Sequence, residues 1–69
     1  MSKIYAKIHP LMDELQYCME HNIHLKDEER VLAVMDKLSL YIAHLSDADR
    51  DYLHSAQDAY EEGREWIIE

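Results

Sequence analysis

The chain has 69 residues, which is enough for one small domain, and its hydrophobic fraction of 48% separates it from disordered proteins of high net charge. One Gly and one Pro leave little material for hairpins, tight turns or phosphate-binding loops, so a strongly helical protein is expected. The formal net charge of −8 argues against direct binding to nucleic acid, because such binding takes clustered Lys and Arg.

An apolar stripe of helical period predicts a first helix over residues 2–21. Pro10 interrupts this stripe, and proline removes one hydrogen bond of a helix. The helix therefore either begins at Pro10 or continues through it with a kink. The stripe keeps one phase across Pro10, which favours the kinked helix. Its apolar positions are Ile4, Ile8, Leu11, Met12, Leu15, Cys18 and Met19.

A second helix is predicted over residues 27–45, after a connection in which Asn22 takes the left-handed conformation that ends a helix. Acidic residues at its start, Asp27 to Glu29, suit the positive end of a helix dipole. Spacings of three and four alternate along its stripe, which predicts near-antiparallel packing in a bundle. The stripe consists of Val31, Val34, Met35, Leu38, Tyr41, Ile42 and Leu45.

A third helix is predicted over residues 47–68, with Ser46 as its N-cap and a very short connection before it. One side of this helix collects Leu53, Ala56, Tyr60, Gly63 and Ile67. The other side collects Asp47, Asp51, Asp58, Glu61, Glu62, Glu65 and Glu69. Gly63 inside a helix costs about 1 kcal/mol relative to alanine, and close approach of a neighbouring chain segment is the expected reason for it. A surface helix with a continuous acidic face is therefore expected.

The predicted fold is all-α: a three-helix antiparallel bundle that forms a single domain over residues 1–69. Tyr17, Leu32 and Leu40 project away from the apolar stripes. Several exposed apolar side chains on so short a chain predict a second buried surface, and hence a homo-oligomer, with these three residues in a dimer interface. A plain monomer is the alternative.

The sequence contains no phosphate-binding loop, nucleophile elbow or Ser-His-Asp arrangement, so we expect no enzyme activity and no cofactor. Cys18 lies on an apolar stripe, where a thiol is expected to be buried and inert. A lone cysteine fits a reducing compartment, and neither a signal-peptide core nor a long apolar run occurs. A cytoplasmic protein without membrane contact is therefore expected.

Five histidines raise the question of metal binding. His21 and His24 are three residues apart near a loop, with acidic side chains close in sequence, and they are weak candidates for metal ligands. The Glu-x-x-His pairs of di-iron bundles are missing. Solvated surface histidines without a metal are the preferred interpretation.

The acidic face allows two interpretations. In the first, it is a solvated helix face that keeps a small protein soluble. In the second, it is a docking surface for a basic region of another molecule, or a mimic of the nucleic-acid backbone. Trp and Tyr are frequent interface anchors. In the docking interpretation, the contact residues are Asp51, Asp58, Glu62, Glu65 and Trp66.

The stretch LSDADRDYLHSAQDAYEEGREW, residues 45–66, resembles the C-terminal helices of small uncharacterised proteins from marine cyanophages. Those proteins tend to show Ser-x-x-Asp-Arg-x-Tyr, then an Ala-Gln pair, then Glu-Glu and a final Trp. The resemblance implies a phage accessory protein that acts in the host cytoplasm by modifying metabolism, transcription or photosynthesis through binding. It implies no catalytic residue.

The leading functional hypothesis is a small acidic, non-enzymatic protein that binds a host protein of unknown identity. The alternatives are a metal-binding helical protein that uses His21 and His24, and a purely structural homodimer.

Overall fold

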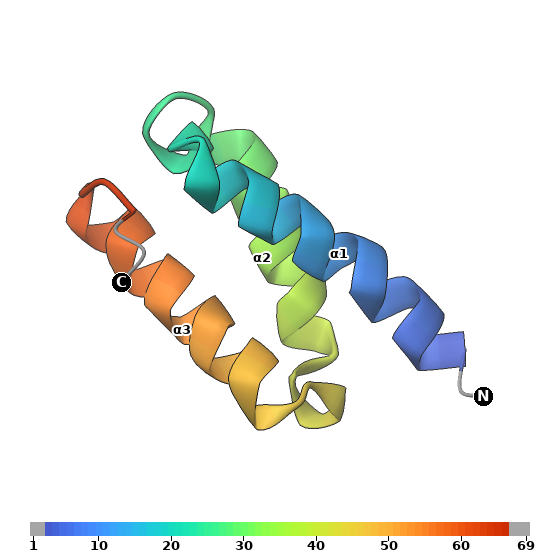
Figure 1. Cartoon of the computed structure of the whole chain (residues 1–69). Helices are drawn as coiled ribbons and strands as arrows, with labels where there is room; N and C mark the ends of the chain where they lie inside the picture. Colours follow the sequence, from blue (N-terminus) through green and yellow to red (C-terminus); the bar gives the residue numbers. More distant parts are fainter. Residues whose placement is uncertain (1–2, 67–69) are drawn as a thin grey trace.

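The computed structural model describes residues 3–66, which form three α-helices and two short 3₁₀ turns. The helices are α1 (Lys3–Glu20), α2 (Glu28–Leu40) and α3 (Asp47–Glu62), and the turns are η1 (Ile23–Leu25) and η2 (Ile42–His44). Helices α1 and α3 run in the same direction and α2 runs opposite to both (Figure 1). The predicted three-helix antiparallel bundle is confirmed.

Helix α1 continues through Pro10 and does not begin there. Ile8, Met12 and Leu15 are buried on one side of this helix, before and after the proline. Pro10 itself is exposed. The hydrogen bond that proline removes therefore lies at the surface, where water can satisfy the unpaired carbonyl group.

The core is built from the three predicted stripes, one from each helix. Full burial of a side chain such as Leu15, Leu38 or Leu53 contributes roughly 1.5–3 kcal/mol each. The buried side chains of Ala56 and Ala59 are small, so the larger side chains of α1 and α2 can pack close to the α3 backbone. The buried hydrophobic residues are Ile8, Met12, Leu15, Cys18, Met19, Val31, Val34, Met35, Leu38, Leu45, Leu53, Ala56 and Ala59.

The connection between α1 and α2 follows the predicted chemistry. Asn22 has φ 55°, in the left-handed region that ends a helix. Asp27 is the N-cap of α2, and its carboxylate accepts a hydrogen bond from the Arg30 backbone amide at 3.4 Å. Glu28 and Glu29 occupy the first turn of α2, next to the positive end of its dipole.

Helix α2 ends at Leu40, earlier than the predicted end at Leu45. The chain tightens there into η2, whose 3₁₀ geometry places residues three apart on the same side. Ile42 and Leu45 can therefore both face the core. The predicted cap of the next helix is confirmed, because the Ser46 hydroxyl accepts a hydrogen bond from the Asp49 amide at 3.2 Å.

Helix α3 ends at Glu62, and its predicted extension to residue 68 is wrong; Ile67 and Ile68 lie outside the described residues. Gly63 has φ 65°, and the amides of Gly63 and Arg64 donate to the carbonyl oxygens of Tyr60 and Ala59, at 3.2 and 3.1 Å. Gly63 is exposed, and a Cβ added to it would meet no described atom within 4 Å. The prediction that it allows close packing is therefore also wrong: Gly63 is needed for its positive φ.

None of the helices formed by residues 3–66 combines the length and apolar character needed to cross a bilayer.

Replacing Gly63 with alanine should lower the free energy of unfolding by about 1 kcal/mol, because alanine is strained at positive φ. Urea denaturation followed by circular dichroism measures this change. Gly63→Asn is the matched control. It should lower the free energy of unfolding by less than Gly63→Ala does, because asparagine tolerates the left-handed conformation better than alanine. If Gly63 lay inside a continuous helix, Gly63→Ala would instead raise the free energy of unfolding, since alanine is the better helix former. An increase in stability would therefore contradict the observed helix end.

Candidate functional site

The acidic face of α3, defined here as Asp47, Asp51, Asp58, Glu61 and Glu62, lies on the side of the helix opposite to the core. All five residues are exposed, whereas Leu53, Ala56 and Ala59 of the same helix are fully buried. The predicted separation of acidic and apolar sides is confirmed over Asp47–Glu62; Gly63, predicted on the apolar side, is exposed, and Ile67 and Glu69 lie outside the described residues. The predicted contact residue Glu65 is also exposed, but it follows the end of α3 and is not part of this helical face.

Three carboxylates on the acidic face, those of Glu61, Asp51 and Asp58, have no cationic partner among the described residues. Asp47 lies 3.8 Å from the Arg50 guanidinium, and Glu62 pairs with Arg64. Asp51 and Asp58 form no ion pair within residues 3–66. They are seven residues apart, or about two helical turns, so both point the same way at a separation of roughly 10 Å along the axis.

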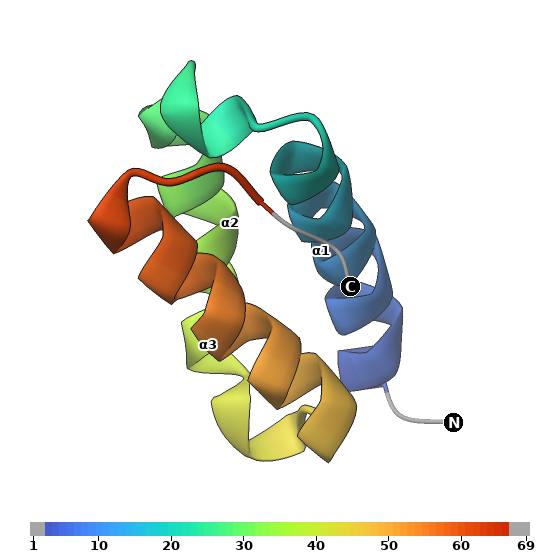
Figure 2. The same cartoon turned by 60° about the vertical axis from the view of Figure 1, so that its left-hand side comes forward.

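Trp66 does not lie on the acidic face, because α3 ends at Glu62, and its role as a contact residue stays a prediction. After Gly63 the chain turns back toward α1 (Figure 2). The Trp66 backbone amide donates to Asn22 Oδ1 at 2.9 Å, and its indole packs on Tyr52, with the ring centroids 5.1 Å apart. The half-buried Trp66 side chain is therefore part of the fold.

His24 fixes the same returning segment. Its side chain is only 4% exposed, and Nε2 lies 2.7 Å from the Arg64 carbonyl oxygen. A carbonyl only accepts hydrogen bonds, so Nε2 carries the hydrogen and donates it. The prediction of a solvated His24 is wrong, because the turn at Asn22 and η1 directs the imidazole inward. We call this group of contacts, made by Asn22, His24, Tyr52, Arg64 and Trp66, the C-terminal clasp.

The C-terminal clasp also buries polar atoms that have no hydrogen-bond partner within residues 3–66. These atoms are His24 Nδ1, the Tyr52 hydroxyl and Trp66 Nε1. Burial raises the pKa of the Tyr52 phenol, and the Glu20 carboxylate acts in the same direction. Because unpaired buried polar groups oppose folding, the clasp should be held less tightly than the apolar core.

The structure does not assemble the two weak candidates for metal binding into one site. His21 is exposed and its ring lies against Tyr17, with the centroids 4.4 Å apart, whereas His24 is buried with Nε2 already bound to a carbonyl. Across the described part of the chain, no group of three His, Cys, Asp or Glu side chains is placed to hold a metal ion.

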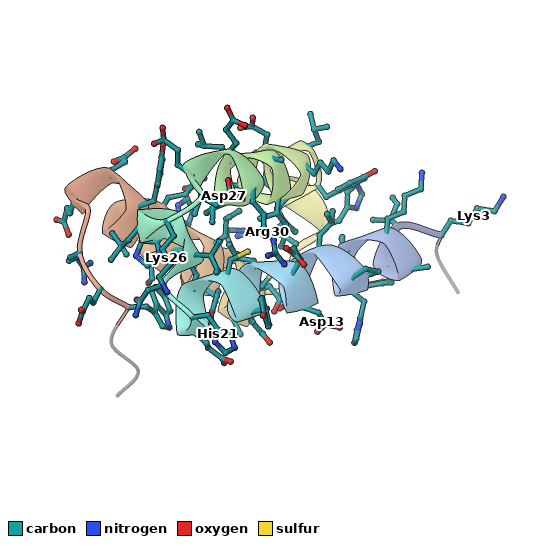
Figure 3. All side chains as sticks on the ribbon, turned by 90° about the horizontal axis from the view of Figure 1, so that it is seen from above. Lys3, Asp13, His21, Lys26, Asp27 and Arg30 are labelled. Atoms are coloured by element: carbon teal, nitrogen blue, oxygen red, sulfur yellow. The ribbon has the colours of Figure 1, made fainter. Side chains whose placement is uncertain are left out.

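An ion pair joins α1 to α2 beside Tyr17. Arg30 Nε donates to Glu14 Oε1 at 2.6 Å, and this hydrogen bond lowers the pKa of the Glu14 carboxyl. The Arg30 guanidinium also lies 5.3 Å from the centre of the Tyr17 ring, within cation–π distance. Figure 3 shows Arg30 between the two helices. Contacts within the chain therefore occupy part of the Tyr17 side chain.

Two of the three residues predicted for a dimer interface, Tyr17 and Leu32, lie on different sides of α2. Tyr17, Leu32 and Leu40 are exposed by 49%, 36% and 81%. Arg30 and Leu32 are two positions apart on α2, so their side chains point about 200° apart around the helix. Since Arg30 covers Tyr17, Leu32 lies on the other flank of α2. Of the three side chains, Leu40 is the most available to a partner.

Cys18 is buried in the core, as predicted. Its thiol donates to Glu14 Oε1 at 3.5 Å, and burial is the main cause that raises its pKa to about 11. At neutral pH the group stays a thiol, which is a poor nucleophile. The geometry gives it a packing role.

No protein-family model matches this sequence, and comparisons with curated proteins and with solved structures return no match. The resemblance of residues 45–66 to cyanophage accessory proteins stays a prediction.

Removing either hydrogen bond of the C-terminal clasp should release Trp66 into water and shift its fluorescence emission to longer wavelength. Asn22→Gly removes the acceptor for the Trp66 amide while keeping the positive φ, and His24→Ala removes the donor to Arg64. Trp66 is the only tryptophan, so the signal has one source. His54→Ala, on the exposed side of α3, is the control and should leave emission unchanged. Unshifted emission in both clasp variants would contradict the assigned contacts.

Proposed function

We propose that this protein is a small non-enzymatic interaction protein that binds a basic surface of a larger protein through the acidic face of α3. The observation that supports the proposal is the pair of exposed carboxylates of Asp51 and Asp58, which have no ion-pair partner within residues 3–66. A Lys or Arg side chain of another molecule can form ion pairs with these two carboxylates. Opposite charges on two partners also accelerate association and suppress wrong partners.

The uneven distribution of charge favours docking over solubility alone. Helix α3 contains six acidic side chains and one basic one, a net charge of −5 out of the chain's total of −8. Solubility depends on net charge and needs no such concentration on one helix. A single-sign surface on one element provides the directional field that steers a charged partner toward it.

The resemblance to cyanophage proteins suggests a setting for this activity. In that setting the larger protein belongs to the infected host and the complex forms in the host cytoplasm. Binding would change host metabolism, transcription or photosynthesis without a catalytic step by this chain.

Self-association is a second candidate, favoured by the exposure of Leu40 at the end of α2. An apolar side chain that is 81% exposed can be buried against the same residue of a second copy in a two-fold dimer. This would make the protein a structural homodimer, with or without a further partner.

Reversing two charges on the acidic face, Asp51→Lys with Asp58→Lys, should abolish capture of the partner from host lysate at low salt. The matched control is Glu29→Lys with Asp36→Lys. These positions are exposed on α2, equally spaced, and produce the same change in net charge. Mass spectrometry should find one protein that the wild type and the control retain, that the variant loses, and that high salt releases. Equal capture by variant and control would remove the acidic face from the proposed function.

Leu40→Glu tests self-association. If Leu40 lies in a homodimer, light scattering should give the mass of a dimer for the wild type and of a monomer for the variant, because a buried unpaired carboxylate opposes association. The fold should be unaffected, since Leu40 is outside the core. A monomeric wild type at high concentration would exclude the structural homodimer.

A further inference from the structure

A shallow groove of about 230 Å³ lies between α1, from Tyr5 to Gln16, and the first turn of α3. Helix α1 packs more extensively on α2 than on α3, so the α1–α3 side of the bundle is more open than the α1–α2 side. Figure 2 views this side, with the segment after α3 crossing it near the far end of α1. The groove lies at the opposite end, next to Tyr5 and His9.

The floor of the groove is apolar and its walls are aromatic and acidic. Ile8 and Met12 are buried core residues that form part of the floor. Tyr5 lies at one wall and is 66% exposed, whereas large aromatic side chains usually bury much of their surface. The described residues that line the groove include no Lys or Arg.

Two carboxylates face this groove. Asp13 lies on the edge of α1 that is turned away from α2, as Figure 3 shows, and its Oδ2 lies 3.3 Å from His9 Nδ1. Asp49 comes from the first turn of α3 and is half-buried. The Asp49 backbone amide is bound by Ser46, but its carboxylate belongs to no ion pair among residues 3–66. A half-buried carboxylate gains more from a cation than an exposed one, because water screens the pair less.

We propose that this groove receives an arginine side chain of the protein that docks on the acidic face; the inference rests on the proposed function. The guanidinium group stacks on aromatic rings such as Tyr5 and binds carboxylates through two parallel N–H donors. The aliphatic stem of arginine covers apolar surface such as that of Ile8 and Met12. The groove volume of about 230 Å³ is below the roughly 300–1,000 Å³ typical of small-molecule sites and suits one side chain.

The groove and the start of the acidic face lie at the same end of α3 but on different sides of it. Asp49 is two positions from both Asp47 and Asp51, so its side chain points about 200° away from theirs, toward α1. A partner that wraps around the start of α3 can place one arginine in the groove and further basic residues on the acidic face. The groove would give the contact its position, and the acidic face would give it long-range attraction.

The test is an NMR titration of the ¹⁵N-labelled chain with N-acetyl-arginine-amide, using N-acetyl-citrulline-amide and N-acetyl-lysine-amide as comparison probes. Citrulline keeps the shape of arginine and removes its charge. We expect arginine to shift the amide signals of Tyr5, His9, Asp13 and Asp49, and to bind at least fivefold more tightly than either comparison probe. Equal binding of citrulline or lysine would overturn the proposal.

Variants locate the binding. Asp49→Asn and, separately, Tyr5→Ala should each weaken arginine binding at least fivefold, whereas Asp36→Asn, the same charge change at an exposed position of α2, should leave binding in the groove unchanged. Tyr5 is largely exposed, so its loss tests the groove without disturbing the core. Unchanged binding in both groove variants would refute the site.

The failure of this inference is separable from that of the proposed function. Shifts confined to Asp51 and Asp58 would refute the groove and leave docking on the acidic face intact. Shifts in the groove, together with equal lysate capture by the charge-reversal variant and its control, would refute the docking function and retain an arginine site.

Discussion

Burial of Leu53, Ala56 and Ala59 against the other two helices fixes how α3 is rotated about its own axis. A helix has one rotation that buries this set, and in that rotation Asp51, Asp58 and Glu62 point to solvent. The exposure of the acidic face is therefore a consequence of core packing. The same rotation turns Tyr60 toward α2, where its hydroxyl donates to Glu28 Oε2 at 3.2 Å. Every functional inference about α3 depends on this packing.

The features that the sequence predicted correctly are those set by local and periodic signals. Three stripes of helical period, the left-handed Asn22 and the Ser46 cap together specify the order and direction of the helices. Pro10 was ambiguous because proline is tolerated both at a helix start and inside a long helix. The phase of the stripe resolved it correctly in favour of a helix that continues through the proline.

The features that the sequence did not predict depend on contacts between distant residues. Gly63 carried a recognisable signal, since glycine is the commonest residue just after a helix, but the apolar periodicity through Ile67 outweighed it. The wrong helix end then misplaced Trp66. His24 and Arg64 are 40 positions apart, and the hydrogen bond between them arises only once α3 stops and the chain turns back. The groove beside Asp49 likewise combines α1 with α3, so no local pattern indicates it.

Labelling of carboxyl groups, with and without the partner bound, tests the central claim that the acidic face is a docking surface. A carbodiimide with an amine reagent modifies exposed Asp and Glu side chains, and mass spectrometry reports the extent at each position. In the isolated chain Asp51, Asp58, Asp36 and Glu29 should all react, because all four are exposed. In the captured complex Asp51 and Asp58 should be protected while Asp36 and Glu29 still react. Undiminished labelling of Asp51 and Asp58 in the complex would contradict the account.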